Sequence, residues 1–135
     1  AMLQRALPRA RRYQGKVELR REDVQNLPFG DETFDTVFTS CVFCSVTDPL
    51  KGLQEVRRVL KEDGQLLMLE HVRSHSPLGW LMDLVNPVMV RLWGPNVNRD
   101  TVGNLRRAGL QVVQVDTLFL DIVKLIEARV PEREV

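Results

Sequence analysis

The stretch from Glu22 to His71 reads EDVQNLPFGDETFDTVFTSCVFCSVTDPLKGLQEVRRVLKEDGQLLMLEH and decides the fold of this chain. Residues 34–40 have the aromatic and β-branched composition of a strand. Asp48-Pro49 then predicts the start of a helix, because aspartate caps free amides and proline suits the first helical position. The run 65–71 is nearly all apolar, as in a strand covered on both faces. A strand, a helix and a strand in this order predict a right-handed parallel crossover.

The remaining elements are predicted from hydrophobic spacing. Residues 2–13 have helical spacing although Pro8 weakens the middle, and residues 17–21 alternate like a short strand that ends next to Asp23. Gly64 is expected to end the helix that begins after Asp48. After His71 we expect a helical insertion over 77–93 that is broken near Asn86-Pro87, and then a helix over 100–108 that ends at Gly109. Residues 110–116 and 119–128 are expected to be strands. They should form an antiparallel hairpin with a turn near Thr117-Leu118.

Length and composition indicate one domain over residues 1–135, with 44% hydrophobic and 27% charged residues. The net charge of +1 argues against a dedicated nucleic-acid-binding protein. Positive charge does gather before residue 23, and we favour a solvated helix face over a phosphate-binding patch. Two cysteines and the lack of a recognisable signal peptide favour a reducing cytoplasm.

Two runs carry a resemblance to a known family. LPFGDETFDTVFTS and VTDPLKGLQEVRRVLKEDGQLLMLEH resemble class I S-adenosylmethionine-dependent methyltransferases, in particular the ubiquinone/menaquinone-type branch with a type 11 domain. The continuation from Glu70 to Val112 resembles relatives that methylate small thiols or lipid head groups. The resemblance implies an α/β fold with a Rossmann-like, mostly parallel sheet, a C-terminal antiparallel hairpin and helices on both faces. It also implies methyl transfer from S-adenosylmethionine to a small-molecule acceptor such as a thiol, a quinone or a lipid head group.

The resemblance gives four residues a role in cofactor binding. Asp23 matches the acidic residue that accepts a hydrogen bond from the adenine amino group, and Val24 lends backbone contact. The alternative for Asp23 is an aspartate that only caps a turn. Ser40 and Cys41 follow the next strand and are expected to line the methionine part of the cofactor.

Three residues are assigned to the acceptor side: Cys44, His71 and Trp80. His71 is the tentative catalytic residue, because imidazole titrates near neutrality and can orient an acceptor or take its proton. Its alternative is a histidine bonded to backbone. The Trp80–Trp93 insertion occupies the place of a substrate lid in relatives. A core helix is an equal alternative, and contact with a membrane surface is a third that we favour less.

The pairs Cys41/Cys44 and His71/His75 also suggest a zinc site. The interval between them is longer than the roughly 12–15 residues of a compact zinc finger, so we expect no metal. A redox role for the two cysteines is no better supported, because no helix is expected to start at Cys41.

The family's glycine-rich cofactor loop does not occur before Asp23. We therefore expect a sheet that lacks two strands and leaves 34–40 at an apolar edge, which invites pairing with a second copy of the chain. The expectation is weak or absent activity for this chain alone. A non-catalytic, dimeric methyltransferase-like module is the alternative.

Overall fold

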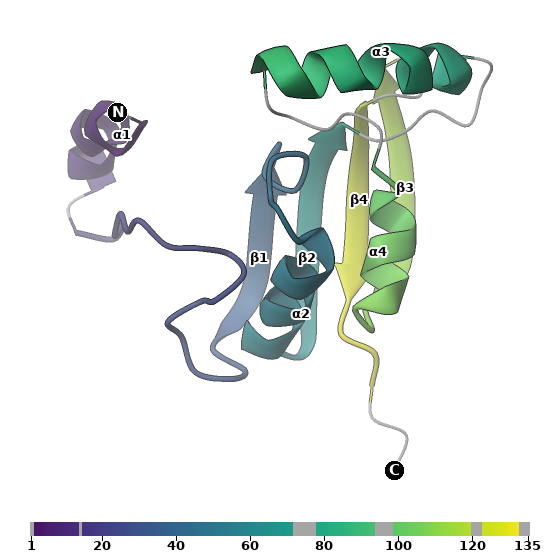
Figure 1. The fold of residues 1–135 in the computed structure, drawn as a ribbon. Helices are drawn as coiled ribbons and strands as arrows, with labels where there is room; N and C mark the ends of the chain where they lie inside the picture. Colours follow the sequence, from purple (N-terminus) through teal and green to yellow (C-terminus); the bar gives the residue numbers. More distant parts are fainter. Residues whose placement is uncertain (1, 14, 72–77, 94–98, 120–122, 133–135) are drawn as a thin grey trace.

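The computed structural model describes residues 2–13, 15–71, 78–93, 99–119 and 123–132. Figure 1 shows a twisted sheet with helices beside it and one helix beyond the end of its strands. In chain order the elements are α1 (Met2–Ala10), the 3-10 helix η1 (Arg11–Tyr13), β1 (Phe34–Ser40), α2 (Pro49–Val59), β2 (Leu60–His71), α3 (Leu78–Trp93), α4 (Thr101–Arg107), β3 (Gln111–Phe119) and β4 (Val123–Arg129).

The sheet has four strands in the order β1-β2-β4-β3. β1 and β2 are parallel, and β4 is antiparallel to both of its neighbours, so three strands share one direction. The α/β class, the parallel crossover through α2, the C-terminal hairpin and the edge position of residues 34–40, all predicted from the sequence, are therefore confirmed. Asp48 caps α2 as predicted, because its side chain accepts a hydrogen bond from the backbone N–H of Lys51.

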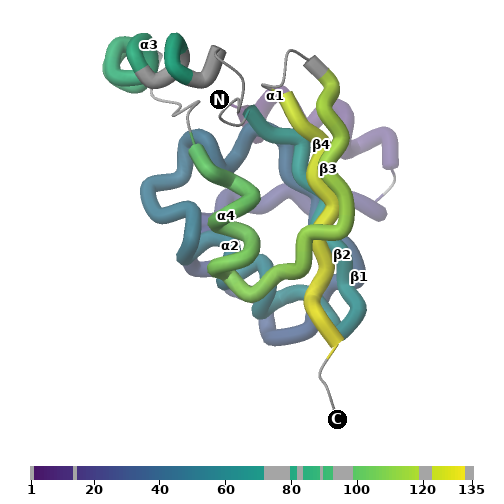
Figure 2. Tube along the Cα trace, turned by 90° about the vertical axis from the view of Figure 1, so that its right-hand side faces the viewer, coloured from purple at the N-terminus to yellow at the C-terminus, as the bar shows by residue number. Residues whose placement is uncertain are grey.

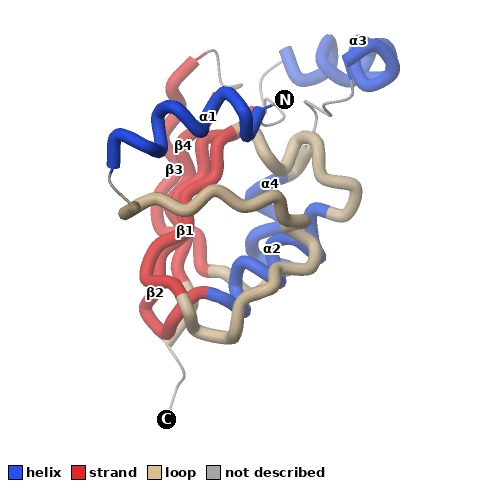
Figure 3. The backbone as a smooth tube through the Cα atoms, turned by 90° about the vertical axis from the view of Figure 1, so that its left-hand side faces the viewer, coloured by secondary structure: helices blue, strands red, loops and turns tan. Residues whose placement is uncertain are grey.

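The core lies between the sheet and α2 and α4, which pack on the same face (Figures 2 and 3). Alternate residues of β2 and β4 face these helices and are buried, whereas their neighbours on the other face are partly exposed. Helices were expected on both faces; within the described residues only this face carries packed helices. The buried cluster contains Phe43, Leu53, Val56, Leu60, Leu66, Met68, Leu105, Ala108, Leu110, Ile126 and Ala128.

Two predictions near the start of the sheet are wrong. Residues 17–21 form no strand, because none of the strands that the structure describes lies beside them to supply ladder hydrogen bonds. The helix α2 ends at Val59 rather than at Gly64, since Leu60 is already extended and begins β2. Gly64 instead permits a tight bend after Asp63, whose φ is 62°: a Cβ on Gly64 would lie 2.7 Å from the carbonyl oxygen of Lys61.

Two predictions in the second half also need correction. α3 continues through Pro87 and is not broken there. Thr117 and Leu118 lie within β3, so the hairpin connection comes later and falls on residues 120–122, outside the described residues.

Ion pairs and hydrogen bonds of Arg58 and Glu55 on α2, here called the clamp, hold the segment that leads into β1. Arg58 pairs with Glu55 (Nε–Oε1, 2.8 Å) and with Asp31 (Nη1–Oδ1, 2.7 Å). Arg58 also donates to the carbonyl oxygens of Phe29 and Leu27, and Glu55 Oε2 accepts from the N–H of Leu27. The hydrogen bonds from Arg58 lower the pKa of Glu55 to about 2.

The clamp predicts a pH dependence of stability. Glu55 has a folded pKa below its unfolded value, so its contribution is present above about pH 4.5 and is lost as pH falls toward 2. Glu55→Gln should lower the free energy of unfolding at pH 7 by about 1–2 kcal/mol. The difference from wild type should shrink when urea unfolding is repeated from pH 5 down to pH 2. A difference that stays constant over this range would contradict the assignment.

Candidate functional site

A cavity of about 900 Å³ lies beyond the carboxyl end of β1. Parallel strands of an α/β sheet end at one edge, and the loops there are the usual place for ligands. Two segments far apart in the sequence, residues 21–25 and 40–47, form most of its wall. The lining residues are Met2, Arg21, Glu22, Asp23, Val24, Gln25, Ser40, Cys41, Val42, Ser45, Val46 and Thr47.

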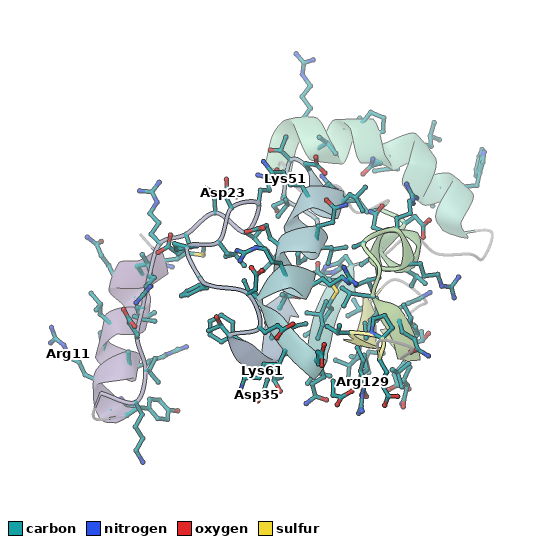
Figure 4. All side chains as sticks on the ribbon, turned by 90° about the horizontal axis from the view of Figure 1, so that it is seen from below. Arg11, Asp23, Asp35, Lys51, Lys61 and Arg129 are labelled. Carbon is teal, nitrogen blue, oxygen red and sulfur yellow. The ribbon has the colours of Figure 1, made fainter. Side chains whose placement is uncertain are left out.

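Asp23 is held in a short turn on one side of this cavity. Its Oδ1 accepts hydrogen bonds from the backbone N–H of Gln25 at 2.9 Å and from Gln25 Nε2 at 3.2 Å. These bonds, with the nearby charge of Lys51 (Figure 4), hold the pKa of Asp23 below its usual value. The turn-capping role is thus present, and both described hydrogen bonds use a single carboxylate oxygen. At neutral pH Asp23 is an ionised acceptor on the cavity wall.

Val24 is placed by its contact with α2. A Cβ on Gly52 would lie 3.3 Å from Val24 Cγ1 and 3.0 Å from Phe43 Cε1. Glycine at this position therefore lets the 23–24 turn and the loop after β1 approach the same helix. Leu53 and Val56 of α2 are fully buried nearby, which fixes the helix against the sheet.

Ser40 and Cys41 also line this cavity, at the point where β1 ends. Cys41 has a φ of 51°, so the chain turns sharply as it leaves the strand. Its Sγ lies 3.6 Å from Nδ1 of His71, at the end of β2. Partial burial of the sulfur, followed by the negative charge of Glu70, raises the pKa of the otherwise exposed Cys41 thiol. Cys41 is therefore a neutral thiol at physiological pH.

Glu70 organises this turn and was missed by the sequence analysis. Its side chain is 1% exposed, and its Oε1 accepts hydrogen bonds from the backbone N–H groups of Val42 at 3.0 Å and Phe43 at 3.2 Å. The second oxygen, Oε2, is buried with no hydrogen-bond partner among the described residues. The available signal was that Glu70 is the only acidic residue in the apolar run 65–71. The carboxylate ties the end of β2 to the loop after β1 and so shapes the cavity wall.

The predicted site residues are brought together only in part. Asp23, Val24, Ser40 and Cys41 line one cavity. His71 contacts Cys41 but is not a lining residue, and Cys44 is buried with its thiol donating to the carbonyl oxygen of Cys41. Trp80, in α3, is 71% exposed and does not line this cavity.

The described residues contain no cluster of three or more metal-ligating side chains. Both cysteines are free. His75, the fourth residue of the zinc alternative, lies outside the described residues.

Comparison with known proteins points to one enzyme family. Residues 1–68 match the family of methyltransferase domains. The chain is 37% identical over 130 residues to the demethylmenaquinone methyltransferase of Clavibacter sepedonicus, covering 82% of this chain and 53% of that protein. It is 36% identical over 91 residues to the thiol S-methyltransferase TMT1B of Rattus norvegicus, covering 64% of this chain and 36% of that protein. The chain thus spans about half or less of the length of these relatives.

Solved structures share the fold at low sequence identity. The [4+2]-cyclase SpnF superimposes with a TM-score of 0.74 at 16% identity, over 93% of this chain and 61% of that one. A SAM-dependent methyltransferase from Aquifex aeolicus gives a TM-score of 0.68 at 23% identity, over 96% of this chain and 64% of that one. A cyclase and a methyltransferase on one fold show that the fold alone does not fix the reaction.

The role of Glu70 is tested by two substitutions. Glu70→Ala leaves the buried amides of Val42 and Phe43 without their acceptor and should lower the free energy of unfolding by roughly 2–4 kcal/mol. Glu70→Gln keeps an acceptor oxygen and should lose less than half as much. Urea unfolding measures both, and equal losses in the two variants would contradict the hydrogen-bonding role.

The two cysteines should differ in reactivity. Cys41 is exposed and Cys44 is buried, so iodoacetamide should label Cys41 first in the folded protein. Because the pKa of Cys41 is raised, labelling should be slow at pH 7 and should speed up as pH rises above 9. Peptide mass spectrometry with a Cys41→Ser variant as control measures both; labelling that begins at Cys44 would contradict the geometry.

Proposed function

Because the chain belongs to the family of methyltransferase domains, we propose that it binds S-adenosylmethionine and serves methyl transfer to a small-molecule acceptor. The observation that carries the proposal is that Asp23, Val24, Ser40 and Cys41 all line one cavity. Its volume, about 900 Å³, falls in the range of small-molecule and cofactor sites. The similarity to a quinone methyltransferase and a thiol methyltransferase supports a thiol or quinone acceptor, and a lipid head group is a third class.

The residues present fit the two ends of the cofactor. Asp23 is an ionised acceptor suited to the amino group of adenine, and the backbone of Val24 lies beside it. Ser40 and Cys41 offer a hydroxyl and a neutral thiol to the methionine end. S-adenosylmethionine supplies an electrophilic methyl group when bound, and the protein's task is to hold it in line with the acceptor.

The acceptor side is assigned to the end of β2. His71 Nδ1 lies 3.6 Å from Cys41 Sγ, so an acceptor beside Cys41 would be within reach of the imidazole. In this proposal His71 orients the acceptor or takes its proton. Cys44 stabilises the turn at Cys41, because its thiol donates a hydrogen bond to the Cys41 carbonyl oxygen. Trp80 stays a candidate for the acceptor side, although it is not among the residues that line the cavity.

A second candidate is a non-catalytic module that pairs with a copy of itself. β1 is an edge strand of the described sheet, and Phe38 on it is 62% exposed. An exposed apolar edge favours pairing with another strand, so this proposal places the homodimer contact at β1. In both candidates the free thiols favour a cytoplasmic location.

Calorimetric titration with S-adenosylhomocysteine separates the candidates. The first predicts a micromolar Kd for the wild-type chain, and Asp23→Ala should weaken binding roughly 10- to 100-fold through loss of a charged acceptor. Asp35→Asn is the matched control. Asp35 is also an exposed aspartate with a lowered pKa, but it pairs with Lys61 near the opposite end of β1 and should leave binding unchanged.

Absence of heat at millimolar ligand would overturn cofactor binding by this chain and favour the non-catalytic module. An equal loss of affinity in the Asp23 and Asp35 variants would overturn the assignment of Asp23 to the adenine amino group.

A further inference from the structure

The outer surface of α3 carries a continuous row of exposed apolar side chains. Two residues that are four or about eleven positions apart in a helix lie on the same side of it, because each residue turns the helix by about 100°. Each member of this row is between 43% and 71% exposed. We call it the α3 stripe: Trp80, Leu81, Leu84, Val85, Val88 and Leu92.

The α3 stripe is not explained by the packing of the protein. Single exposed apolar residues are common on protein surfaces, but a contiguous row of six large ones marks an interaction surface. By helical spacing, Arg91 lies between its members on the helix surface. The partner must therefore be apolar and must also tolerate or prefer positive charge.

A second observation identifies the charge of that partner. Residues 1–17 contain five basic residues and no acidic one. α1 lies at the same end of the molecule as α3, the end where β1 and β2 finish (Figures 1 and 3), and Arg11 projects away from the rest of the chain (Figure 4). We call these residues the basic segment: Arg5, Arg9, Arg11, Arg12 and Lys16, all of them exposed.

A lipid surface fits both features better than a second copy of the chain. Two copies joined through the α3 stripes would bring two basic segments toward each other, and the repulsion would oppose the contact. An anionic bilayer accepts the apolar stripe at its acyl boundary and attracts the basic segment at its head groups. Trp80 and Arg91 suit this position, since tryptophan favours the interface and arginine can extend to the head groups.

The length of α3 sets its orientation. Its 16 residues correspond to about 24 Å, less than the ~30 Å of a bilayer core. Among the described residues no helix is long and apolar enough to cross a membrane. A helix of this kind lies in the plane of the interface.

We propose that the α3 stripe and the basic segment dock this end of the protein on the surface of an anionic lipid bilayer. This interaction goes beyond the proposed methyl transfer and does not depend on it. The partner is defined by its chemistry, an acyl layer beneath anionic head groups.

Vesicle sedimentation tests the docking in the absence of any cofactor. The chain should bind vesicles of an equal mixture of phosphatidylcholine and phosphatidylglycerol, and should bind pure phosphatidylcholine vesicles more weakly. Leu84→Glu, in the middle of the stripe, should lower the partition coefficient by about tenfold or more. Leu118→Glu is the matched control, because Leu118 is similarly exposed on β3 (57% against 64%) and lies outside the stripe.

A second set of variants tests the charge. Arg9→Gln and Arg11→Gln should each weaken binding to the anionic vesicles by a factor of about five and leave binding to neutral vesicles unchanged. Circular dichroism of each variant confirms that the fold is kept.

Three outcomes would overturn the proposal. The first is that the wild-type chain does not sediment with anionic vesicles, and the second is that the Leu84 and Leu118 variants lose vesicle binding equally. The third is that the wild-type chain binds no vesicles and forms a dimer by light scattering, which Leu84→Glu converts to a monomer. The last result would assign the stripe to a second copy. Because no step uses S-adenosylmethionine, failure here leaves the calorimetric test of methyl-donor binding unaffected.

Discussion

The parallel pairing of β1 with β2 is the constraint on which the rest of the structure depends. It places Ser40 and Leu69 opposite each other, so both strands finish at the same edge of the sheet. The crossover through α2 closes this unit, and the buried cluster around Leu53 and Leu66 stabilises it. Glu70 then uses the end of β2 to hold the amides that follow β1. The cavity forms where the end of β1 and the loop that follows it meet the 21–25 segment.

Elements set by local chemistry could be predicted from the sequence. Asp48-Pro49 starts α2 because capping and the fixed φ of proline act within a few residues. Asp100 and Gly109 bound α4 for similar local reasons. Elements set by distant partners could not be predicted in this way. Residues 17–21 alternate like a strand, but a strand forms only where a neighbour pairs with it.

In the candidate site, too, some residues could be assigned from the sequence, whereas a residue that acts on a distant segment could not. Asp23, Val24, Ser40 and Cys41 were assigned from a family resemblance, and the structure places all four around one cavity. Glu70 escaped detection because the amides it holds lie 27 and 28 residues earlier in the chain, and no local pattern records such a contact. Trp80 was grouped with the acceptor because the insertion matches a lid in relatives. In this structure it lies in an exposed apolar row on α3, and its role on the acceptor side stays a prediction.

The central claim is that Asp23 and the end of β1 hold the two ends of one methyl donor. A crystal structure of the chain with S-adenosylhomocysteine tests it most directly. The account predicts the adenine amino nitrogen at about 3 Å from a carboxylate oxygen of Asp23, with the homocysteine end against Ser40 and Cys41. A ligand bound elsewhere, or one whose adenine lies away from Asp23, would contradict the account.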